Sequence, residues 1–180
     1  IQNRPAYEFA VISGGNTIPG FGNGKALIRI PYEPGEGENE ENIIVYRLDS
    51  NGELTTVNGF YRDGYVLVVL KSLSTNIIGY NEVVFDDVHD EWFAKAVNFI
   101  AARNITKGIG NNLYGPYLPV TRGQFIKMLC DAYGIKPVTS GDNFADAGNT
   151  WYTPYLAAAK QLGISKGVGN NMFAPEQEIT

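Results

Sequence analysis

The sequence predicts an α+β multidomain protein in which an N-terminal antiparallel β-sandwich precedes all-α repeats of the helix-loop-helix type. Three observations lead to this expectation. Short apolar stretches alternate with turn residues up to about Val84, a helical period begins near Phe85, and the second half of the chain repeats itself. The expected domains are residues 1–84 for the sandwich, 85–138 for a first repeat and 139–180 for a truncated second repeat.

Short stretches rich in β-branched and aromatic residues fill the first 84 residues and have the length of typical strands. The dipeptides Asn51-Gly52 and Asp63-Gly64 stand between such stretches and favour tight hairpin turns. Short strands joined by regular turns predict a small antiparallel sandwich. The expected strands are Tyr7–Ile12, Ala26–Ile30, Ile43–Leu48, Leu54–Val57, Tyr65–Leu70 and Ile77–Tyr80.

The second half of the chain contains an internal repeat with an offset of 59 residues and no gap. Phe, Asp, Trp, Gly, Asn and Pro recur unchanged, and apolar residues replace one another between them, which is typical of a structural repeat. The recurring pairs include Phe85 and Phe144, Asp87 and Asp146, Trp92 and Trp151, Lys107 and Lys166, Gly108 and Gly167, Gly110 and Gly169, Pro116 and Pro175, and Thr121 and Thr180.

Each repeat is expected to begin with an amphipathic helix, residues 91–103 in the first repeat, followed by a loop rich in glycine and asparagine. A second helix is expected at 122–133. Thr121 and Gln124 have the spacing of a capping box at its start, and Gly134 follows its end as a C-terminal cap.

This pattern resembles the S-layer homology domain family. The resemblance rests on Phe85-x-Asp87-Val88, Trp92, Ile105-x-x-Gly108-x-Gly110, Tyr114-x-Pro116 and Val120-Thr121-Arg122, and on their counterparts in the second repeat. It implies a non-catalytic module that anchors exported bacterial proteins to secondary cell wall polysaccharides, often pyruvylated and attached to peptidoglycan. The usual Ile-Thr-Arg-Ala-Glu of the family stands here as Val120-Thr121-Arg122-Gly123-Gln124.

The anionic sugar implied by the resemblance suggests a set of ligand-binding residues. Arg122 begins a helix, where free backbone N–H groups already favour an anion, and its guanidinium can hold a carboxylate in a bidentate manner. Glycines permit close approach of the backbone, and tryptophan offers a flat face to a sugar ring. The candidates are Arg122, Thr121, Trp92, Trp151, Gly108, Gly110, Gly167, Gly169, Lys107 and Lys166, with no catalytic residue and no metal ligand.

Structural alternatives stand beside these roles. The two tryptophans could pack in the core or in a groove wall, and Arg122 could form a salt bridge between repeats. Lys107 and Lys166 could simply be solvated. We interpret Asp87 and Asp146 as residues that cap helices or brace loops.

Composition excludes several classes of function. The net charge of −5 gives no basic field for nucleic acid, and no apolar run is long enough to insert into a membrane. One cysteine and one histidine leave too few ligands for a zinc or haem site, so no cofactor is expected. The resemblance, not the composition, implies an extracellular protein of the bacterial cell surface, whose signal peptide is expected to lie outside this sequence.

Two other functions stay open. The repeats could contact other copies of the chain in a surface lattice, or they could be the tail of a secreted polysaccharide-degrading enzyme. The offset predicts an Arg and a helix after Thr180, so we expect a fragment of a longer protein. Such a fragment would expose the apolar face of Trp151, Tyr155, Leu156 and Ala159 and would self-associate.

Overall fold

The computed structural model describes residues 3–18, 20–57, 59–139 and 141–179. The chain forms two compact units. One comprises residues 1–84 and 89–103, and the other comprises residues 85–88 and 104–180. Thr180, which the repeat pairs with Thr121, and Ile1 lie outside the described residues. No helix among the described residues is long and apolar enough to cross a membrane.

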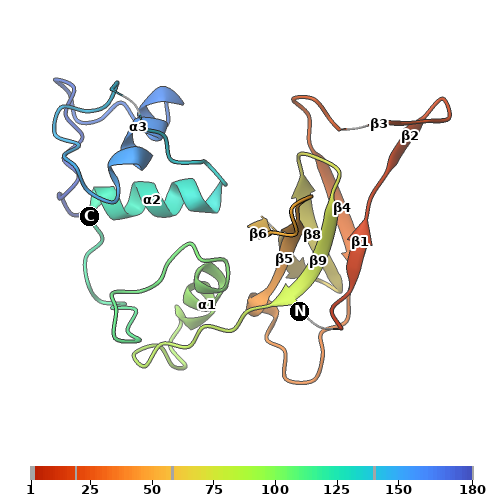
Figure 1. Cartoon of the computed structure of the whole chain (residues 1–180). Coiled ribbons are helices and arrows are strands. Elements are labelled where there is room, and N and C mark those ends of the chain that lie inside the picture. Colours follow the sequence, from red (N-terminus) through yellow and green to blue (C-terminus); the bar gives the residue numbers. More distant parts are fainter. Residues whose placement is uncertain (1–2, 19, 58, 140, 180) are drawn as a thin grey trace. The chain divides into compact units, whose positions relative to one another are not determined.

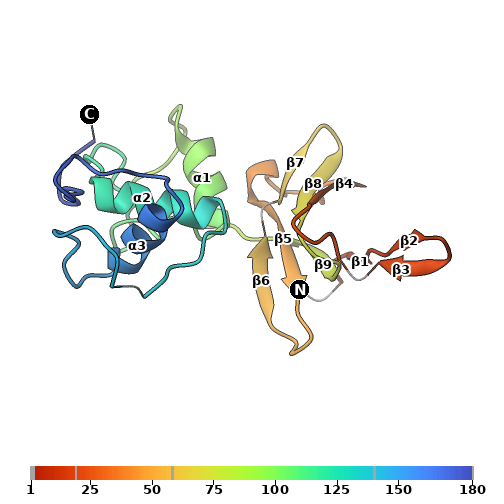
Figure 2. The same cartoon turned by 90° about the horizontal axis from the view of Figure 1, so that it is seen from above.

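The described residues of the first unit form three antiparallel sheets (Figure 1). One sheet has four strands in the order β1-β9-β5-β6, and a second has three in the order β4-β8-β7. The third is the hairpin of β2 and β3, which projects away from the other strands in both views (Figure 2). The strands are β1 (Ala6–Glu8), β2 (Val11–Ser13), β3 (Asn16–Ile18), β4 (Ala26–Pro31), β5 (Ile43–Leu48), β6 (Leu54–Val57), β7 (Gly59–Arg62), β8 (Tyr65–Leu70) and β9 (Thr75–Tyr80).

Alternating apolar side chains give the four-stranded and three-stranded sheets a common core. In β8, Val66, Val68 and Leu70 are buried while Val69 is exposed, as the two-residue period of a strand requires. They pack with Ile43 and Val45 of β5 and with residues of β4 and β9. Burying these branched side chains is the main stabilising contribution in this unit.

Both expected hairpins are present, but only the one at Asp63-Gly64 has a tight two-residue turn, since five residues separate the paired Leu48 and Leu54 at the other. Asp63 and Gly64 adopt φ values of 50° and 82° between β7 and β8, which is the left-handed geometry that a two-residue turn needs. Between β5 and β6, Gly52 has a φ of 80°, and the Asp49 carboxylate accepts N–H bonds from Asn51 and Glu53.

Helix α1 (Ala94–Ala102) belongs to the same unit as the strands. It contacts the short 3-10 helix η1 (Glu40–Asn42), and Arg103 at its end is half-buried. The Arg103 guanidinium donates hydrogen bonds to the carbonyls of Glu41, Ile43 and Gly59 at 2.8–3.1 Å. Desolvation lowers the pKa of Arg103 to about 10, so the group stays charged at neutral pH.

The second unit is built around α2 (Arg122–Ala132) and α3 (Thr153–Gln161), which pack against each other. The expected capping box is present. Thr121 accepts the Gln124 N–H, and the Gln124 side chain accepts the Thr121 N–H. Gly134 follows the helix with a φ of 63°, and its N–H bonds to the Asp131 carbonyl, as a C-terminal cap requires.

The core of the second unit contains side chains from both helices and two phenylalanine rings from the loops. Leu156 and Ala159 of α3 are fully buried with Ile126 of α2, Phe144 and Phe173. The expectation that Leu156 and Ala159 would be exposed is therefore wrong, because Ile126 and the two rings cover them. Trp151, at 56% exposure, does remain accessible.

The predicted fold class is wrong. Among the described residues, strand makes up 28% and helix 18%, with three short α-helices, so the C-terminal repeats are not an all-α arrangement. Loops rich in glycine and asparagine occupy much of each repeat, and their left-handed residues cannot continue a helix. Helix α1 also groups with the strands, and the described strands form three sheets where a simple sandwich has two.

Candidate functional site

The loops of the two repeats have the same conformation. We call residues 105–120 loop 1 and residues 164–179 loop 2. In loop 1, Asn111 and Asn112 have φ values of 50° and 57°, and the Leu113 N–H donates to the Gly110 carbonyl at 2.9 Å. Loop 2 repeats this turn, with Asn170 and Asn171 at 49° and 56°. Asparagine tolerates the left-handed region better than most residues, which explains the repeated pair.

An aspartate braces each loop. The Asp87 carboxylate accepts the N–H groups of Tyr114 and Gly115 at 2.7 and 2.8 Å. Asp146 accepts those of Phe173 and Ala174 at 2.8 and 2.7 Å. The interpretation of these aspartates as loop braces is confirmed.

Aromatic pairs lie beside these braces. Phe85 packs on Tyr114 with ring centroids 5.6 Å apart, and Phe144 packs on Phe173 at 5.2 Å. Phe85, Phe144 and Phe173 are all buried, so each pair anchors its loop to the interior of the unit.

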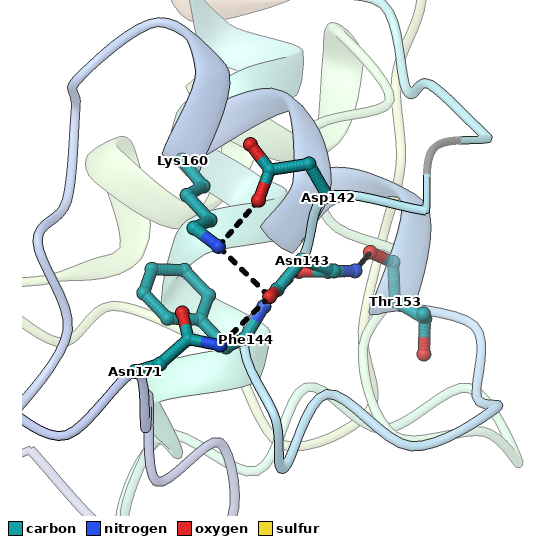
Figure 3. Close-up of polar contacts among 6 residues, drawn as sticks. All are labelled: Asp142, Asn143, Phe144, Thr153, Lys160 and Asn171. Atoms are coloured by element: carbon teal, nitrogen blue, oxygen red, sulfur yellow. Dashed lines mark hydrogen bonds and ion pairs between the residues drawn. The ribbon is translucent and has the colours of Figure 1, made fainter.

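A polar network of the second repeat holds the segment before Phe144 against α3 (Figure 3). Lys160 Nζ lies 2.6 Å from a carboxylate oxygen of Asp142 and donates to the Asn143 carbonyl at 2.9 Å. The same carbonyl accepts a bond from Asn171 Nδ2 at 3.2 Å, and Asn143 Nδ2 donates to the Thr153 carbonyl. The first repeat has Ala101 in place of Lys160 and uses a different contact, in which Asn112 donates to Asp86.

A groove of the second unit lies between loop 1 and α2 and has a volume of about 340 Å³. We call it groove 1. Its walls are loop 1 with Lys107, Gly108 and Tyr114, one side of α2, and Trp151 from the second repeat. On α2 the groove is lined by Gln124, Lys127 and Met128, which the helical period places on one side.

The two lysines that line groove 1, Lys107 and Lys127, differ in their surroundings. Lys127 pairs with Asp131 at 2.7 Å and donates to the Ile105 carbonyl, so its charge is largely compensated. Lys107 is exposed on loop 1. Burial raises the pKa of Tyr114, so its phenol is neutral at physiological pH. The groove therefore combines a cation, a phenol and the indole of Trp151.

A smaller groove of about 180 Å³, groove 2, lies between the opposite side of α2 and loop 2. Arg122, Phe125 and Ile126 line it together with Ser165 and Phe173. Arg122 Nε donates to the Phe173 carbonyl at 2.8 Å, and the guanidinium lies 4.6 Å from the Phe173 ring centroid. Arg122 thus connects α2 to loop 2, and Thr121 caps the helix beside it.

The glycines and lysines expected to bind ligand are placed in both loops. The N–H groups of Gly108 and Gly167 donate within their own loops, to Thr106 and Ser165 at 3.2 and 3.1 Å. Gly110 and Gly169 form the loop turns, and Lys166 is exposed on loop 2.

The structure brings three of the candidates, Lys107, Gly108 and Trp151, together in groove 1. Trp92 belongs to the first unit and is 93% exposed. Sequence reasoning missed Lys127, although its spacing from Gln124 could have placed it on the same side of the helix. Among the described residues there is no group of three His, Cys, Asp or Glu side chains that could hold a metal ion.

Two copies of one braced loop, with a groove on each side of the helix between them, define a module built from repeats. Residues 84–126 and 143–180 match the S-layer homology domain. The two segments are repeats of that family, as the sequence pattern predicts.

Proteins of differing names share this region. Exoglucanase XynX of Acetivibrio thermocellus is 34% identical over 99 residues, which cover 54% of this chain and 9% of the relative. Endo-1,4-beta-xylanase A of Thermoanaerobacterium saccharolyticum is 33% identical over 54% of the chain and 8% of its own length. The S-layer protein sap of Bacillus anthracis is 31% identical over 53% of the chain and 12% of its own length. The chain thus matches only about a tenth of each relative.

Proposed function

We propose that the two repeats anchor the protein that carries them to the bacterial cell surface by binding a secondary cell wall polysaccharide in groove 1. The observation that carries this proposal is the composition of that groove. An indole, a phenol and an exposed lysine line a hollow of about 340 Å³, which is the size of a small-ligand site.

Each part of groove 1 has a role in this proposal. The half-exposed indole of Trp151 packs edge-on against Tyr152, with ring centroids 5.1 Å apart, so its orientation is supported from the protein side. A sugar ring stacks on this indole, and Lys107 attracts an anionic substituent such as a pyruvyl carboxylate. Because Gly108 has no side chain, its backbone lies close to the Leu113 carbonyl further along loop 1. This close contact keeps the groove wall in place.

The relatives support a non-catalytic role for this region. Proteins named as an exoglucanase, a xylanase and an S-layer protein share the same hundred or so residues, which form a small part of each. A segment that occurs in proteins of such different names is better explained by a role in placing them at the same location than by a role in any one reaction. We infer a cell-surface location for this chain. The division into domains at residues 1–84, 85–138 and 139–180 stays a prediction.

Retention on cell walls tests the proposal. The chain is mixed with sacculi that keep their secondary polysaccharide and with sacculi from which it has been stripped. We expect retention on the first only, and an affinity loss of about tenfold for Trp151→Ala and for Lys107→Ala. Tyr133→Ala is the matched control, because Tyr133 is also an exposed aromatic residue but lies outside groove 1.

Three results would contradict the proposal. Equal retention on stripped sacculi would show that the polysaccharide is not the partner. Unchanged retention of both groove variants would show that another surface binds. No retention on either kind of sacculi would instead favour the runner-up function, lattice contacts between copies of the chain.

A further inference from the structure

The sheet of β4, β8 and β7 carries apolar side chains on the side turned away from its core. Val66 and Val68 of β8 are buried in the core, and Leu67 and Val69 alternate with them toward the opposite side. Leu27 of β4 pairs with Val69 in the register, so it lies on that side as well. Leu27 is 61% exposed and Val69 is 39% exposed. We call this side the outer face, and Leu27, Leu67 and Val69 form an apolar strip along it.

Two arginines stand on the outer face, one on each side of β8. Arg29 of β4 pairs with Leu67, and its guanidinium lies 4.3 Å from the centroid of the Tyr65 ring. Arg62 of β7 pairs with Tyr65, and its guanidinium lies 5.6 Å from the centroid of the Phe60 ring. Both arginines are exposed. Stacking on a ring restricts where each guanidinium can lie and leaves its N–H edge open to a planar anion.

The positive charge of the outer face is not balanced by carboxylates. Among the residues that the structure describes, neither Arg29 nor Arg62 forms an ion pair. Lys25 directly precedes β4 and Lys71 directly follows β8, and both are exposed at the same end of the sheet. Asp63, in the turn after Arg62, is the one carboxylate adjacent to these cations in the sequence. In a chain with a net charge of −5, this face is therefore suited to an anionic partner.

The size of the outer face favours a slender partner over a folded protein. Strand β8 has six residues, which span about 20 Å, and the two strands that flank it lie about 10 Å apart. The resulting area of about 200 Å² is far below the roughly 800 Å² that each partner contributes to a stable protein interface. A single extended polymer covers such a surface.

Two kinds of slender anionic polymer fit this description, an acidic peptide and an acidic polysaccharide. An extended peptide gains affinity by adding to a sheet edge, where its backbone forms hydrogen bonds, and a sheet face offers no such bonds. A sugar ring instead has a flat C–H side that packs on apolar side chains, while its carboxylate lies at the rim of the ring within reach of a guanidinium. An apolar strip with flanking arginines therefore favours the polysaccharide.

We propose that the outer face binds an anionic polysaccharide whose sugar rings carry carboxylates. The rings pack on the apolar strip, and Arg29 and Arg62 each hold a carboxylate in a bidentate manner. Because these groups are exposed, the binding is weak and decreases as salt is added. The site belongs to the first unit, so it is independent of groove 1 and of the function proposed for the repeats.

Isothermal titration calorimetry of the full chain with three polymers of similar length tests this assignment. Polygalacturonate carries a carboxylate on every ring, its methyl ester has the same rings without the charge, and polyglutamate has the charge without the rings. We expect measurable binding to polygalacturonate alone, with an affinity that falls as the concentration of sodium chloride is raised.

Variants on the outer face locate the site. Arg29→Ala and Arg62→Ala should each weaken binding about fivefold, which is the upper end for an exposed ion pair. Leu27→Asp places a negative charge at an exposed position of the apolar strip and should abolish binding. Arg47→Ala is the matched control, because Arg47 lies on β5 of the four-stranded sheet and should leave the affinity unchanged.

Groove 1 variants separate the two sites. Trp151→Ala and Lys107→Ala should bind polygalacturonate as the wild type does. If they weakened binding and Arg29→Ala did not, the polymer would occupy groove 1 and the proposal would be wrong. Equal affinity for polyglutamate would assign the outer face to an acidic protein segment instead. Absence of binding to polygalacturonate at low salt would also overturn the proposal, whatever the retention of the chain on cell walls.

Discussion

Arg122 and Phe173 are joined twice across the second unit. The guanidinium of Arg122 lies 4.6 Å from the centroid of the Phe173 ring, and its Nε donates a 2.8 Å hydrogen bond to the Phe173 carbonyl. The first residue of α2 is thereby attached to loop 2 of the following repeat. A ring and a carbonyl serve here in place of the salt bridge considered from the sequence.

Replacing Arg122 by alanine should lower the free energy of unfolding of the second unit by about 1–2 kcal/mol, since both contacts are lost. Arg122→Lys should recover little of this, because an ammonium group has neither the planar face nor the Nε donor. Urea denaturation of the two variants measures the effect. Unchanged stability together with lost retention on cell walls would instead assign Arg122 to the ligand.

Asp146 should make the second unit sensitive to acid. Burial by itself would raise its pKa, but the N–H groups of Phe173 and Ala174 and the charge of Arg122 outweigh that effect, so the pKa lies below its ordinary value of 3.8. An aspartate with a depressed pKa in the folded state stabilises the fold above the pKa of the unfolded chain. That stabilisation is lost as the pH falls through the folded pKa.

Thermal melts between about pH 7 and pH 2.5 check this expectation. The melting temperature of the wild type should fall more steeply below about pH 4 than that of Asp146→Asn, which has no carboxylate to protonate. Asp63→Asn is a suitable control, because Asp63 lies in a hairpin turn of the other unit where asparagine is also favoured. Parallel curves for Asp146→Asn and the wild type would contradict the role of this carboxylate.

Local signals in the sequence predicted local structure well. The bounds of β5, β6 and β8 agree with the expected strands, and α2 begins at Arg122 behind its capping box. In these segments the residues that decide the structure are neighbours in sequence. The short strands β3 and β7 were missed, since Asn16–Ile18 and Gly59–Arg62 are brief and contain poor strand formers.

Long-range relationships could not be predicted in the same way. Strand β1 pairs with β9 about seventy residues later, and no pattern in either strand specifies that partner. The repeat identified both loops and Trp151, but not that α2 has a groove on each side. The predicted fold class was wrong because the helical periodicity, which covers only about ten residues in each helix, does not extend through the whole repeat.

Arg103 shows how one long-range contact changes the domain organisation. It takes the place of Leu162 in the repeat, and its guanidinium bonds to three carbonyls outside α1 and lies 3.5 Å from the Phe99 ring centroid. Arg103→Met should lower the free energy of unfolding of the first unit by about 3 kcal/mol, because buried carbonyls are left unpaired.

Hydrogen exchange of the α1 amides, Ala94–Ala102, should locate this effect. Arg103→Met should speed exchange along α1. Lys95→Met is the matched control, because Lys95 is 85% exposed and only 3.8 Å from Glu41, a type of pair that contributes less than about 1 kcal/mol. Equal exchange in both variants would mean that apolar packing alone holds α1 on the strands.

Substitutions at Gly108 and Gly110 allow two destabilising effects to be distinguished: a steric clash with neighbouring atoms and the strain of a left-handed backbone. Both have positive φ, at 70° and 98°. A Cβ at Gly108 would lie 2.2 Å from the Leu113 carbonyl oxygen and 2.8 Å from the Phe85 ring, whereas a Cβ at Gly110 meets nothing within 4 Å. Gly110→Ala should therefore cost only the left-handed strain, about 1 kcal/mol.

Gly108→Ala must in addition displace Leu113 or Phe85, and we expect it to lower the free energy of unfolding by about 3 kcal/mol or more. Gly167→Ala should do the same in loop 2, where a Cβ would lie 2.1 Å from the Met172 carbonyl oxygen. Denaturant titration compares the three variants. If Gly108→Ala were no worse than Gly110→Ala, loop 1 would be able to move away from Leu113, and the wall of groove 1 would not be fixed by this contact. Because Gly108 lines groove 1 and Gly167 does not, only Gly108→Ala should also weaken retention on cell walls at a temperature where both variants are folded.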